Sequence, residues 1–229
     1  MIDRMDLIRE AYDLTVEQNR QGTDPLDAVP DSLKNSAQFK EFMRELGPEQ
    51  TGSSAPENRE FLDPQPGMKF LDAGCSANLA NYRLDRWPSL YYGVDISPAL
   101  IRAMRSFAEH NNIAVGALEV TELLRLPFDD SFFDIAAVIG VLEYASLDYC
   151  ESALRELGRV LKTGSRMVVD IPNLDHPHID TMFALERYLG RPNMPKARAD
   201  FERVLAPLFT TLRTDDSCVM LKYFVETHN

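Results

Sequence analysis

The feature that most constrains the fold of this chain is a change of sequence rhythm near residue 66. Beyond it, short apolar runs alternate with helix-like segments. The pattern predicts helices at 79–86 and 97–110, a longer helix from Leu147 that Gly164 ends, and strands at 68–73, 91–96, 113–118, 133–141 and 166–171. Such alternation predicts an α/β fold with a mostly parallel sheet, right-handed crossovers and helices on both faces.

The first part of the chain departs from this rhythm. Residues 1–66 predict two helices, at about 3–20 and 31–46, and a polar, mobile connection at 50–57. We expect these residues to form a helical N-terminal cap, or lid, on a domain that spans 67–229.

The last part of the chain departs from the rhythm as well. Residues 175–207 predict one helix near 179–189 and a loop, and we expect them to form an insertion in the domain. The tail predicts two closing strands, at 210–217 and 218–227.

The net charge of −12 is concentrated at the front of the chain. Residues 1–66 carry 7 Lys and Arg against 14 Asp and Glu, which gives that segment a net charge of −7. A surface this acidic repels phosphate backbones, so a nucleic-acid partner is disfavoured. The acidic helices either only keep the surface solvated or form a lid that prefers a neutral or cationic ligand.

The lengths of the apolar runs and the pattern of cysteines indicate the cellular compartment. No apolar run approaches the roughly 20 residues that span a bilayer, and the polar start Met1–Asp6 is unlike a signal peptide. The three cysteines, Cys75, Cys150 and Cys218, form no CxxC motif. We therefore expect no membrane insertion and a reduced, cytoplasmic setting. The sequence is compatible with a homodimer but does not set the oligomeric state.

The turn after the first predicted strand is the strongest candidate for a binding segment. It reads Asp72-Ala-Gly-Cys-Ser-Ala-Asn78 and lies at the carboxyl end of a strand, where open parallel sheets bind ligands. Gly74 permits a close approach between backbone and ligand, and Asp72 would receive an ammonium group. Asn78 would tolerate left-handed geometry and cap the next helix. The alternative interpretation is a tight strand–helix turn and nothing more.

An acid at the end of the second predicted strand strengthens the first interpretation. Asp95 follows Asp72 by 23 residues, within Tyr92-Gly-Val-Asp-Ile-Ser97. A carboxylate at that place can accept both hydroxyls of a ribose, and Ile96 would then lie against an adenine ring. The alternative for Asp95 is a structural role next to a helix cap.

Several motifs in order resemble those of one family. They are Phe70-Leu-Asp-Ala-Gly-Cys75, Gly93-Val-Asp-Ile-Ser97, Leu126-Pro-Phe-Asp-Asp-Ser-Phe-Phe-Asp134, Val141-Leu-Glu-Tyr144 and Glu156-Leu-Gly-Arg-Val-Leu-Lys162. Over about residues 66–171 the chain resembles the class I S-adenosylmethionine-dependent methyltransferases of the small-molecule type, which includes the quinone-biosynthesis C-methyltransferases.

The resemblance implies a fold and a reaction. The fold would be Rossmann-like, with a seven-stranded sheet whose last strand is antiparallel. The cofactor would be S-adenosyl-L-methionine, and its methyl group would pass by in-line displacement to a small-molecule acceptor. From the residues themselves we expect the acceptor to bind between the N-terminal helices and the insertion, against apolar walls from Tyr12, Met182, Phe183 and Tyr188. The alternative is that these side chains are plain core.

The resemblance also implies roles for residues of the first two motifs. Asp72 and Gly74 would contact the methionine part of the cofactor, in a turn that includes Cys75 and Ser76. Asp95 would hold the ribose. Ser76 and Asn78 depart from the family pattern, because further glycines are usual at both places.

Two later segments would complete the cofactor site. For the adenine amino group the motif favours Glu122, with Leu123 beside it, and leaves Glu119 as the alternative. Ile139 and Gly140, at the end of the fourth predicted strand, would face the reacting sulfonium.

Candidates for a general base follow the fifth predicted strand. They are His176 and His178, because histidine is a residue type suited to general-base catalysis. Tyr144, which stands where the subgroup often has His, would be a hydrogen-bond partner. A base is needed only for a phenol, an alcohol or a carbon acid, and the alternative is that His176-Pro-His178 is a polar loop. We expect no metal site, because no Cys or further His clusters with this pair.

Two other functions compete with methyl transfer. A nicotinamide-dependent dehydrogenase would need G-x-G-x-x-G, and Gly74-Cys-Ser-Ala-Asn-Leu79 does not match it. A non-catalytic protein that binds S-adenosylmethionine or S-adenosylhomocysteine in a degenerate site is compatible with the reduced glycine turn.

Overall fold

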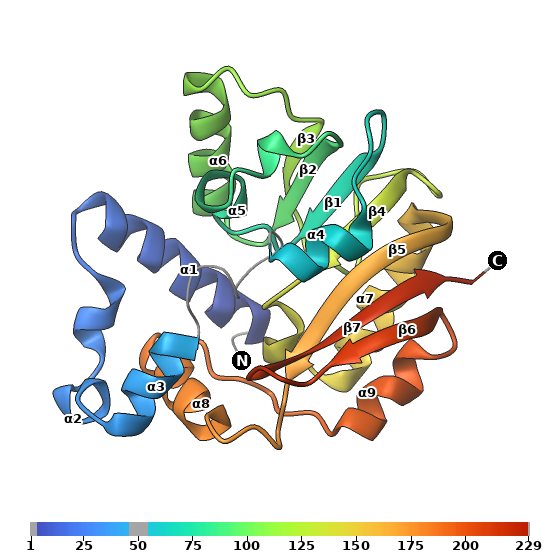
Figure 1. The fold of residues 1–229 in the computed structure, drawn as a ribbon. Coiled ribbons are helices and arrows are strands. Elements are labelled where there is room, and N and C mark those ends of the chain that lie inside the picture. Colours follow the sequence, from blue (N-terminus) through green and yellow to red (C-terminus); the bar gives the residue numbers. More distant parts are fainter. Residues whose placement is uncertain (1–3, 46–54, 229) are drawn as a thin grey trace.

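The computed structural model describes residues 4–45 and 55–228 and contains a seven-stranded sheet in the order β3-β2-β1-β4-β5-β7-β6 (Figure 1). Six strands run parallel, and β7 runs antiparallel to both β5 and β6. The strands are β1 (Lys69–Ala73), β2 (Leu90–Asp95), β3 (Ala117–Val120), β4 (Phe133–Val138), β5 (Leu161–Pro172), β6 (Phe209–Asp215) and β7 (Met220–Thr227). The predicted fold class and the antiparallel last strand are confirmed.

Helices cover the sheet on both faces, so the strands are buried on both sides. In β4, Ile135 and Ala137 belong to one apolar cluster, whereas Ala136 and Val138 belong to another. Successive side chains of a strand point to opposite faces, which is why continuous apolar runs form these strands. The first cluster includes α4 (Pro56–Leu62), α5 (Asn78–Asn81) and α6 (Pro98–His110); the second includes α7 (Leu147–Val160) and α9 (Arg198–Leu205).

The N-terminal helices pack against the segment that follows β5. Figure 1 shows α1 (Arg4–Arg20), α2 (Asp31–Lys34) and α3 (Ala37–Glu45) beside the sheet together with α8 (Ile179–Tyr188). Phe42 of α3 and Met182 of α8 share a third apolar cluster. The two segments predicted as lid and insertion therefore meet each other.

One carboxylate ties α1 to the sheet domain. Asp13 Oδ1 accepts a hydrogen bond from Ser97 Oγ at 2.5 Å and another from Ala99 N at 3.2 Å. Ser97 is also the N-cap of α6, and its Oγ accepts from Leu100 N at 3.0 Å, with Pro98 in the first turn. The predicted start of this helix and its end at His110 are confirmed.

The predicted helix at 31–46 is interrupted. Asn35 ends α2, and Ser36 begins the next helix because its Oγ accepts from Phe39 N at 3.1 Å. Serine favours such caps over helix interiors. The connection predicted at 50–57 lies mostly outside the described residues, and its last two residues begin α4.

The predicted helix at 79–86 is also interrupted. It gives the short α5 and a 3-10 turn at Leu84–Arg86, separated by Arg83 at φ +51°. A residue in the left-handed region does not continue a right-handed helix. Neither α4 nor α9 was expected from the sequence.

The prediction that Gly164 ends α7 is wrong. The helix ends at Val160, and Leu161 begins β5, where it pairs with Phe133 of β4. Leu161 fits the helical stripe by spacing, but its buried place in the sheet decides its conformation. Gly164, at φ +72°, lies inside β5 where the register with β4 shifts.

The third strand lies later than the predicted 113–118. Ile113 N donates to Ala108 O at 2.9 Å, so this part of the chain folds back on the end of α6. Ile113 and Val115 are apolar because they cover the cluster beneath that helix. Pairing with β2 begins only at Ala117.

Candidate cofactor and substrate site

A cavity of about 310 Å³ opens at the carboxyl ends of β1, β2 and β4. The strand order reverses between β1 and β4, and open α/β sheets bind ligands at such a point. The volume lies in the range of small-molecule pockets, about 300–1,000 Å³. Seven predicted site residues line it: Gly74, Ser76, Asp95, Ile96, Leu123, Ile139 and Gly140.

The opposite walls of the cavity are mostly apolar. They come from α1, α3, α8 and the beginning of β7, and they include Met5, Ile8, Tyr12, Phe42, Met182, Leu185 and Met220. We call these seven residues the apolar wall. Of the wall residues expected from the sequence, Tyr12 and Met182 belong to it, whereas Phe183 packs partly buried in the third cluster and Tyr188 is 50% exposed.

The turn after β1 is held by the neighbouring strand. Gly74 N and Cys75 N both donate to Val94 O, at 2.8 and 2.9 Å. Gly74 lies at φ +79° and Ser76 at φ +42°, so Ser76, not Asn78, takes the second left-handed position. A Cβ on Gly74 would lie 2.2 Å from Val141 Cγ2, which explains why the turn keeps this glycine.

Asn78 orients Asp72 and does not cap the helix. Its Nδ2 donates to Asp72 Oδ2 at 3.1 Å, and Tyr91 Oη donates to the same oxygen at 2.9 Å. Ala77 occupies the cap position of α5, so the predicted cap is wrong. Among the described residues, Asn78 lines the cavity and the 1% exposed Asp72 does not. Asn78 therefore lies at the cavity wall and links it to the buried Asp72.

Asp95 is a buried carboxylate that the backbone fixes in place. Its Oδ2 accepts from Ser76 N at 2.8 Å and its Oδ1 from Ser97 N at 2.9 Å. Burial raises its pKa to about 6, although these two N–H groups oppose the rise. Each carboxylate oxygen has two lone pairs, so both oxygens can still accept a hydroxyl from the cavity.

Cys75 supports the turn from below. Its side chain is fully buried and packs in the cluster under α5 and α6. Burial raises the pKa of the thiol well above its ordinary value, so the group stays protonated. The described lining of the cavity does not include Cys75.

The two acids considered for adenine lie at different places. Glu119 is 44% exposed at its side chain and lies 3.7 Å from Arg105 Nη2. Glu122 is exposed too, and it shares a small hollow with Ile96 and Thr121, which also line the main cavity. Neither carboxylate lines the cavity among the described residues, and Glu122 is the nearer of the two. The adenine assignment stays a prediction.

The predicted histidines hold α3 in place. His176 Nε2 lies 3.2 Å from Glu45 Oε1, and His178 Nε2 lies 3.7 Å from Glu45 Oε2. Within the described residues, Glu45 lines the cavity and neither histidine does. A role for the pair as a general base stays a prediction, and their contact with Glu45 joins the end of α3 to the segment after β5.

Tyr144 belongs to a buried polar network behind the cavity wall. Its hydroxyl donates to Glu186 Oε2 at 2.8 Å and lies 3.2 Å from Tyr12 Oη. Arg191 Nε lies 2.9 Å from Glu186 Oε2, and its guanidinium lies 4.7 Å from the centre of the Tyr12 ring. Burial raises the pKa of Tyr144 well above its ordinary value, so the hydroxyl acts as a hydrogen-bond donor that orients Glu186.

Two further carboxyls line the cavity, and the sequence interpretation missed them. Glu143 lies two residues beyond Val141, in the short turn Leu142–Tyr144. Asp170 lies in β5, and its Oδ1 accepts from Gly140 N at 2.9 Å. Burial raises the pKa of Glu143 to about 8 and that of Asp170 to about 7. In the sequence, each is an isolated acid near the end of an apolar strand. Such an acid could have been noticed as a candidate, because burying a charge is costly and often serves a function.

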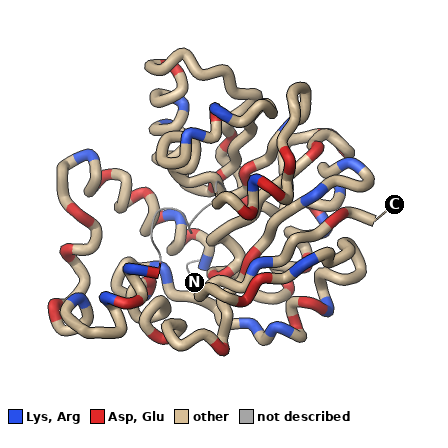
Figure 2. The backbone as a smooth tube through the Cα atoms, viewed as in Figure 1, with Lys and Arg blue, Asp and Glu red and all other residues tan. Residues whose placement is uncertain are grey.

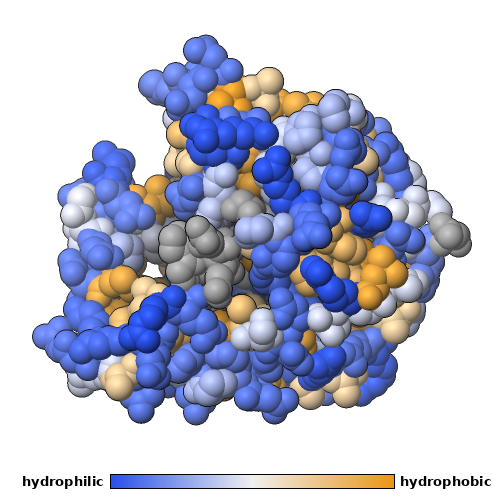
Figure 3. Space-filling model, in the orientation of Figure 1, coloured by the Kyte–Doolittle hydropathy of each residue, from blue (hydrophilic) through white to orange (hydrophobic). Residues whose placement is uncertain are grey.

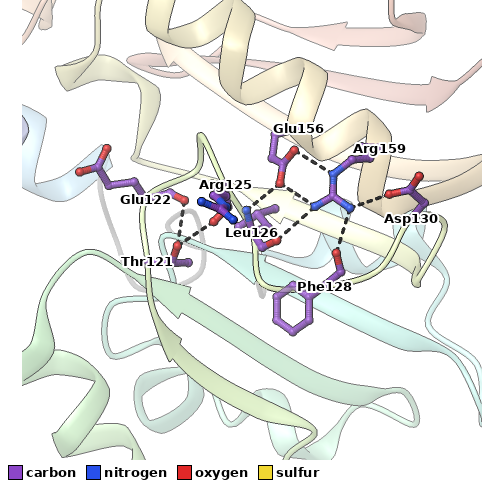
Figure 4. A network of polar contacts seen from close by, with 8 residues as sticks. All are labelled: Thr121, Glu122, Arg125, Leu126, Phe128, Asp130, Glu156 and Arg159. Atoms are coloured by element: carbon purple, nitrogen blue, oxygen red, sulfur yellow. Dashed lines mark hydrogen bonds and ion pairs between the residues drawn. The ribbon is translucent and has the colours of Figure 1, made fainter.

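Two of the motifs serve the fold and not the ligand. Figure 4 shows Arg159 of α7 donating to Leu126 O at 3.1 Å and Phe128 O at 2.9 Å, and pairing with Glu156 and Asp130. Glu156 Oε1 also accepts from Leu126 N at 2.7 Å. This network fixes the chain after β3, and that chain gives the cavity Leu123.

Comparison with known proteins places these motifs in a family. A family model described as a methyltransferase domain matches residues 71–169, a range that runs from β1 into β5 and contains the turn, Asp95 and Glu143. Residues 71–169 therefore match a methyltransferase domain. The resemblance inferred from the motifs is confirmed.

The matched segment is similar to curated proteins that are named as methyltransferases. Demethylmenaquinone methyltransferase of Corynebacterium kroppenstedtii is 32% identical over 112 residues, which are 48% of this chain and 44% of that protein. The O-methyltransferase cnsE of Penicillium expansum is 30% identical over 141 residues, which are 61% of this chain and 50% of that protein. The chain therefore spans about half the length of these relatives or less.

A solved structure shares the fold over the whole length. Magnesium protoporphyrin IX methyltransferase from Synechocystis PCC 6803, with bound S-adenosylhomocysteine, has a TM-score of 0.67 and 17% sequence identity. The superposition covers 99% of this chain and 100% of that chain. It shows that the helices outside the methyltransferase domain belong to the same architecture.

The surface around the domain is charged and mostly polar. Figure 2 shows Lys and Arg interspersed with Asp and Glu along the backbone, and the face in Figure 3 is mostly hydrophilic with separate hydrophobic areas. None of the described helices combines the length and apolarity that crossing a membrane requires. Nor do the described residues place three or more His, Cys, Asp or Glu side chains around one metal position.

Proposed function

We propose that this chain transfers the methyl group of S-adenosyl-L-methionine to a small-molecule acceptor by in-line displacement. One observation carries the proposal. Asp95 is a backbone-fixed carboxylate at the end of β2, and it lines the cavity beside the left-handed turn of Gly74 and Ser76. In an open α/β sheet a carboxylate there can accept the two hydroxyls of a ribose.

The residues of the cavity fit this cofactor. Gly140, at φ +70°, has open space where a Cβ would lie, so the backbone at the end of β4 is accessible to a ligand. Ile96 and Leu123 offer apolar sides for adenine, and Asn78 offers its amide to the methionine part. When bound, S-adenosyl-L-methionine supplies an already activated methyl sulfonium.

The protein contributes position and exclusion of water. Ile8 of α1, Phe42 of α3 and Met182 of α8 bring an apolar surface to the side of the cavity opposite the sheet. Holding two reactants in line lowers the activation barrier, because the entropy of bringing them together is already lost on binding. We therefore assign the N-terminal helices and the segment at 175–207 to the acceptor side, as a lid and an insertion on the methyltransferase domain.

The size of the cavity supports a small acceptor, and the cysteines support a reduced compartment. A cavity of about 310 Å³ holds small molecules and not a folded polymer. Cys75 and Cys150 are buried free thiols and Cys218 is a partly exposed one, which favours a reduced, cytoplasmic environment.

Calorimetric titration with S-adenosylhomocysteine tests the proposal. We expect wild-type protein to bind it, and we expect Asp95→Ala to bind about 10- to 100-fold more weakly, because hydrogen bonds to a charged group contribute about 1.5–3 kcal/mol. Glu119→Ala, an exposed acid paired with Arg105, is the control and should bind as the wild type does. Equal affinity for the Asp95 variant would refute the ribose assignment.

Two further outcomes separate the competing functions. Preference of the wild type for NAD over S-adenosylhomocysteine would overturn the proposal in favour of a dehydrogenase. Binding of S-adenosylhomocysteine without methyl transfer to any member of a metabolite panel would favour a non-catalytic binder.

A further inference from the structure

The cavity joins an apolar wall to an excess of carboxyl groups. Among the described residues that line it, five are acidic, Glu45, Asp95, Glu143, Asp170 and Glu186, and one is basic, Lys222. Buried carboxylates are costly unless a partner compensates them. The partners of each acid therefore indicate where a ligand has to supply charge.

Four of the five acids have partners in the protein. Glu45 faces the two histidines, and Asp95 accepts two backbone N–H groups. Glu186 accepts from Tyr144 and pairs with Arg191. Asp170 accepts from Gly140 N and lies opposite Lys222 in the β5–β7 register, while Lys222 Nζ binds Glu57 of α4.

Glu143 is the acid with the least compensation. Glu45 Oε1 also lacks a hydrogen bond, but it lies 3.2 Å from His176 Nε2, whereas the described residues give the Glu143 carboxylate no ion pair. The Glu143 residue is 6% exposed and lines the cavity, and its Oε2 has no hydrogen-bond partner among the described residues. The neighbouring Tyr144 hydroxyl opposes the rise of the Glu143 pKa. The groups that face Glu143 from other elements are Asp170, Glu186 and Arg191, and Tyr12 and Lys196 lie within electrostatic range. Two of the nearest groups are acids, so the site around Oε2 is short of positive charge.

We propose that Glu143, with Asp170 beside it, is a recognition site for a cationic amine, and that the acceptor is an apolar molecule whose methylated atom is an amine nitrogen. This inference rests on the proposed function and names its substrate class. The apolar wall takes the hydrocarbon part, and an ammonium supplies the hydrogen-bond donors and the charge that Glu143 Oε2 lacks.

The same carboxylate suits the proton transfer that an amine requires. An ammonium has no free lone pair, so one N–H proton first passes to Glu143. The nitrogen lone pair then forms the bond to the methyl carbon, and the methyl carbon–sulfur bond breaks with its electron pair left on sulfur. The proton on Glu143 leaves to water, and the product is the methylated ammonium and S-adenosylhomocysteine. Burial raises the pKa of Glu143 to about 8, and an ammonium beside it favours the ionised form. The bound amine therefore meets a carboxylate that can accept its proton near neutral pH.

Binding of matched probes tests the inference without turnover. We would titrate 4-phenylbutylamine, 4-phenylbutan-1-ol and 4-phenylbutyrate into protein saturated with S-adenosylhomocysteine. These probes share one apolar part and differ in charge. We expect the amine to bind at least about 10-fold more tightly than the alcohol, and the carboxylate to bind least, because a charge-assisted hydrogen bond contributes more than a neutral one.

Three variants test whether Glu143 and Asp170 cause the preference for the amine. Glu143→Gln keeps the size of the side chain and should reduce the preference for the amine to less than about 3-fold, and Asp170→Asn should reduce it partly. Glu151→Gln, an exposed acid of α7 paired with Arg155, is the control and should leave it unchanged. All three should bind S-adenosylhomocysteine as the wild type does, which shows that the fold and the cofactor site are intact.

Two results would overturn the inference while leaving the proposed function standing. One is wild-type protein that binds S-adenosylhomocysteine but not the amine in preference to the alcohol. The other is a Glu143→Gln variant that keeps the amine preference but loses affinity for S-adenosylmethionine and not for S-adenosylhomocysteine. In that case the carboxylate would bind the sulfonium charge of the cofactor and not the acceptor. Failure of wild-type protein to bind S-adenosylhomocysteine would instead count against the proposed function.

Discussion

At the scale of the residue, Gly74 meets two separate demands. Its φ of +79° lies in the left-handed region, and a Cβ there would meet Val141 Cγ2 at 2.2 Å. Gly67, at φ +87°, meets only the first demand, because nothing lies within 4 Å of its Cβ position. The two glycines therefore separate backbone strain from steric contact.

We expect Gly74→Ala to lower the free energy of unfolding by about 2–4 kcal/mol, whereas Gly67→Ala should lower it by about 1–2 kcal/mol, the strain of a left-handed residue. Urea unfolding measures both. The double variant Gly74→Ala/Val141→Ala should recover part of the loss, because it removes the contact and leaves the strain. Equal losses for the two single variants would show that Val141 gives way freely.

Site residues could be predicted from the sequence where the strand pattern positions them, and could not where distant elements do. Gly74, Asp95 and Ile139 lie at or just beyond the carboxyl ends of parallel strands, so the strand pattern alone brings them to one edge of the sheet. Glu143 owes its environment to α8 and to Asp170 on another strand, which no local pattern indicates. Asn78 was expected in the binding turn, but as a helix cap. It orients Asp72 instead, and this partner lies on the preceding strand, where local sequence does not indicate the contact.

At the scale of the element, the chain between β3 and β4 contains no long helix and depends on α7. Arg159 binds two of its carbonyl groups, and Glu156 binds one of its N–H groups. This irregular segment gives the cavity Leu123, so the network of Figure 4 supports the adenine side from outside the cavity.

We expect Arg159→Leu to lower the free energy of unfolding by about 1–3 kcal/mol, because it leaves carbonyl groups of Leu126 and Phe128 without their donors. It should also weaken the binding of S-adenosylhomocysteine severalfold. Arg155→Leu, one turn earlier on α7 and paired only with exposed Glu151 among the described contacts, is the matched control and should change either quantity little. Chemical denaturation and calorimetry supply the two readings, and indistinguishable variants would contradict the anchoring role.

Elements were predictable where local signals and burial agree. The Ser97–Pro98 start of α6 combines a capping side chain with a residue suited to the first turn. Leu161 shows the opposite case, in which spacing favours a helix and pairing with Phe133 makes a strand. The start of the third strand was predicted too early, since Ile113 packs on α6 and not in the sheet.

At the scale of the whole molecule, buried acids link stability to pH. Burial raises the pKa of Glu143 to about 8 and that of Asp170 to about 7, whereas both return to about 4 in the unfolded chain. Between about pH 4 and pH 8 the folded state thus binds more protons than the unfolded state. The free energy of unfolding contributed by these groups therefore falls as the pH rises.

Glu143→Gln removes one of these groups. We expect its free energy of unfolding, relative to the wild type, to increase by at least about 1 kcal/mol between pH 5 and pH 8. Urea unfolding at pH 5, 6, 7 and 8 measures the difference. Glu151→Gln should give a difference that does not change with pH, and a constant difference for Glu143→Gln as well would show that Glu143 titrates normally.

The face that α1 turns toward the cavity has a consequence for redesign. Met5, Ile8 and Tyr12 lie about one turn apart, so a single helix face supplies much of the apolar wall. Gly74, Asp95 and Gly140 belong instead to the edge of the sheet. Under the proposed function, acceptor choice and cofactor binding reside on separable parts of the chain. A small library at three positions of one helix therefore suffices to search for new acceptors while the sheet stays as it is.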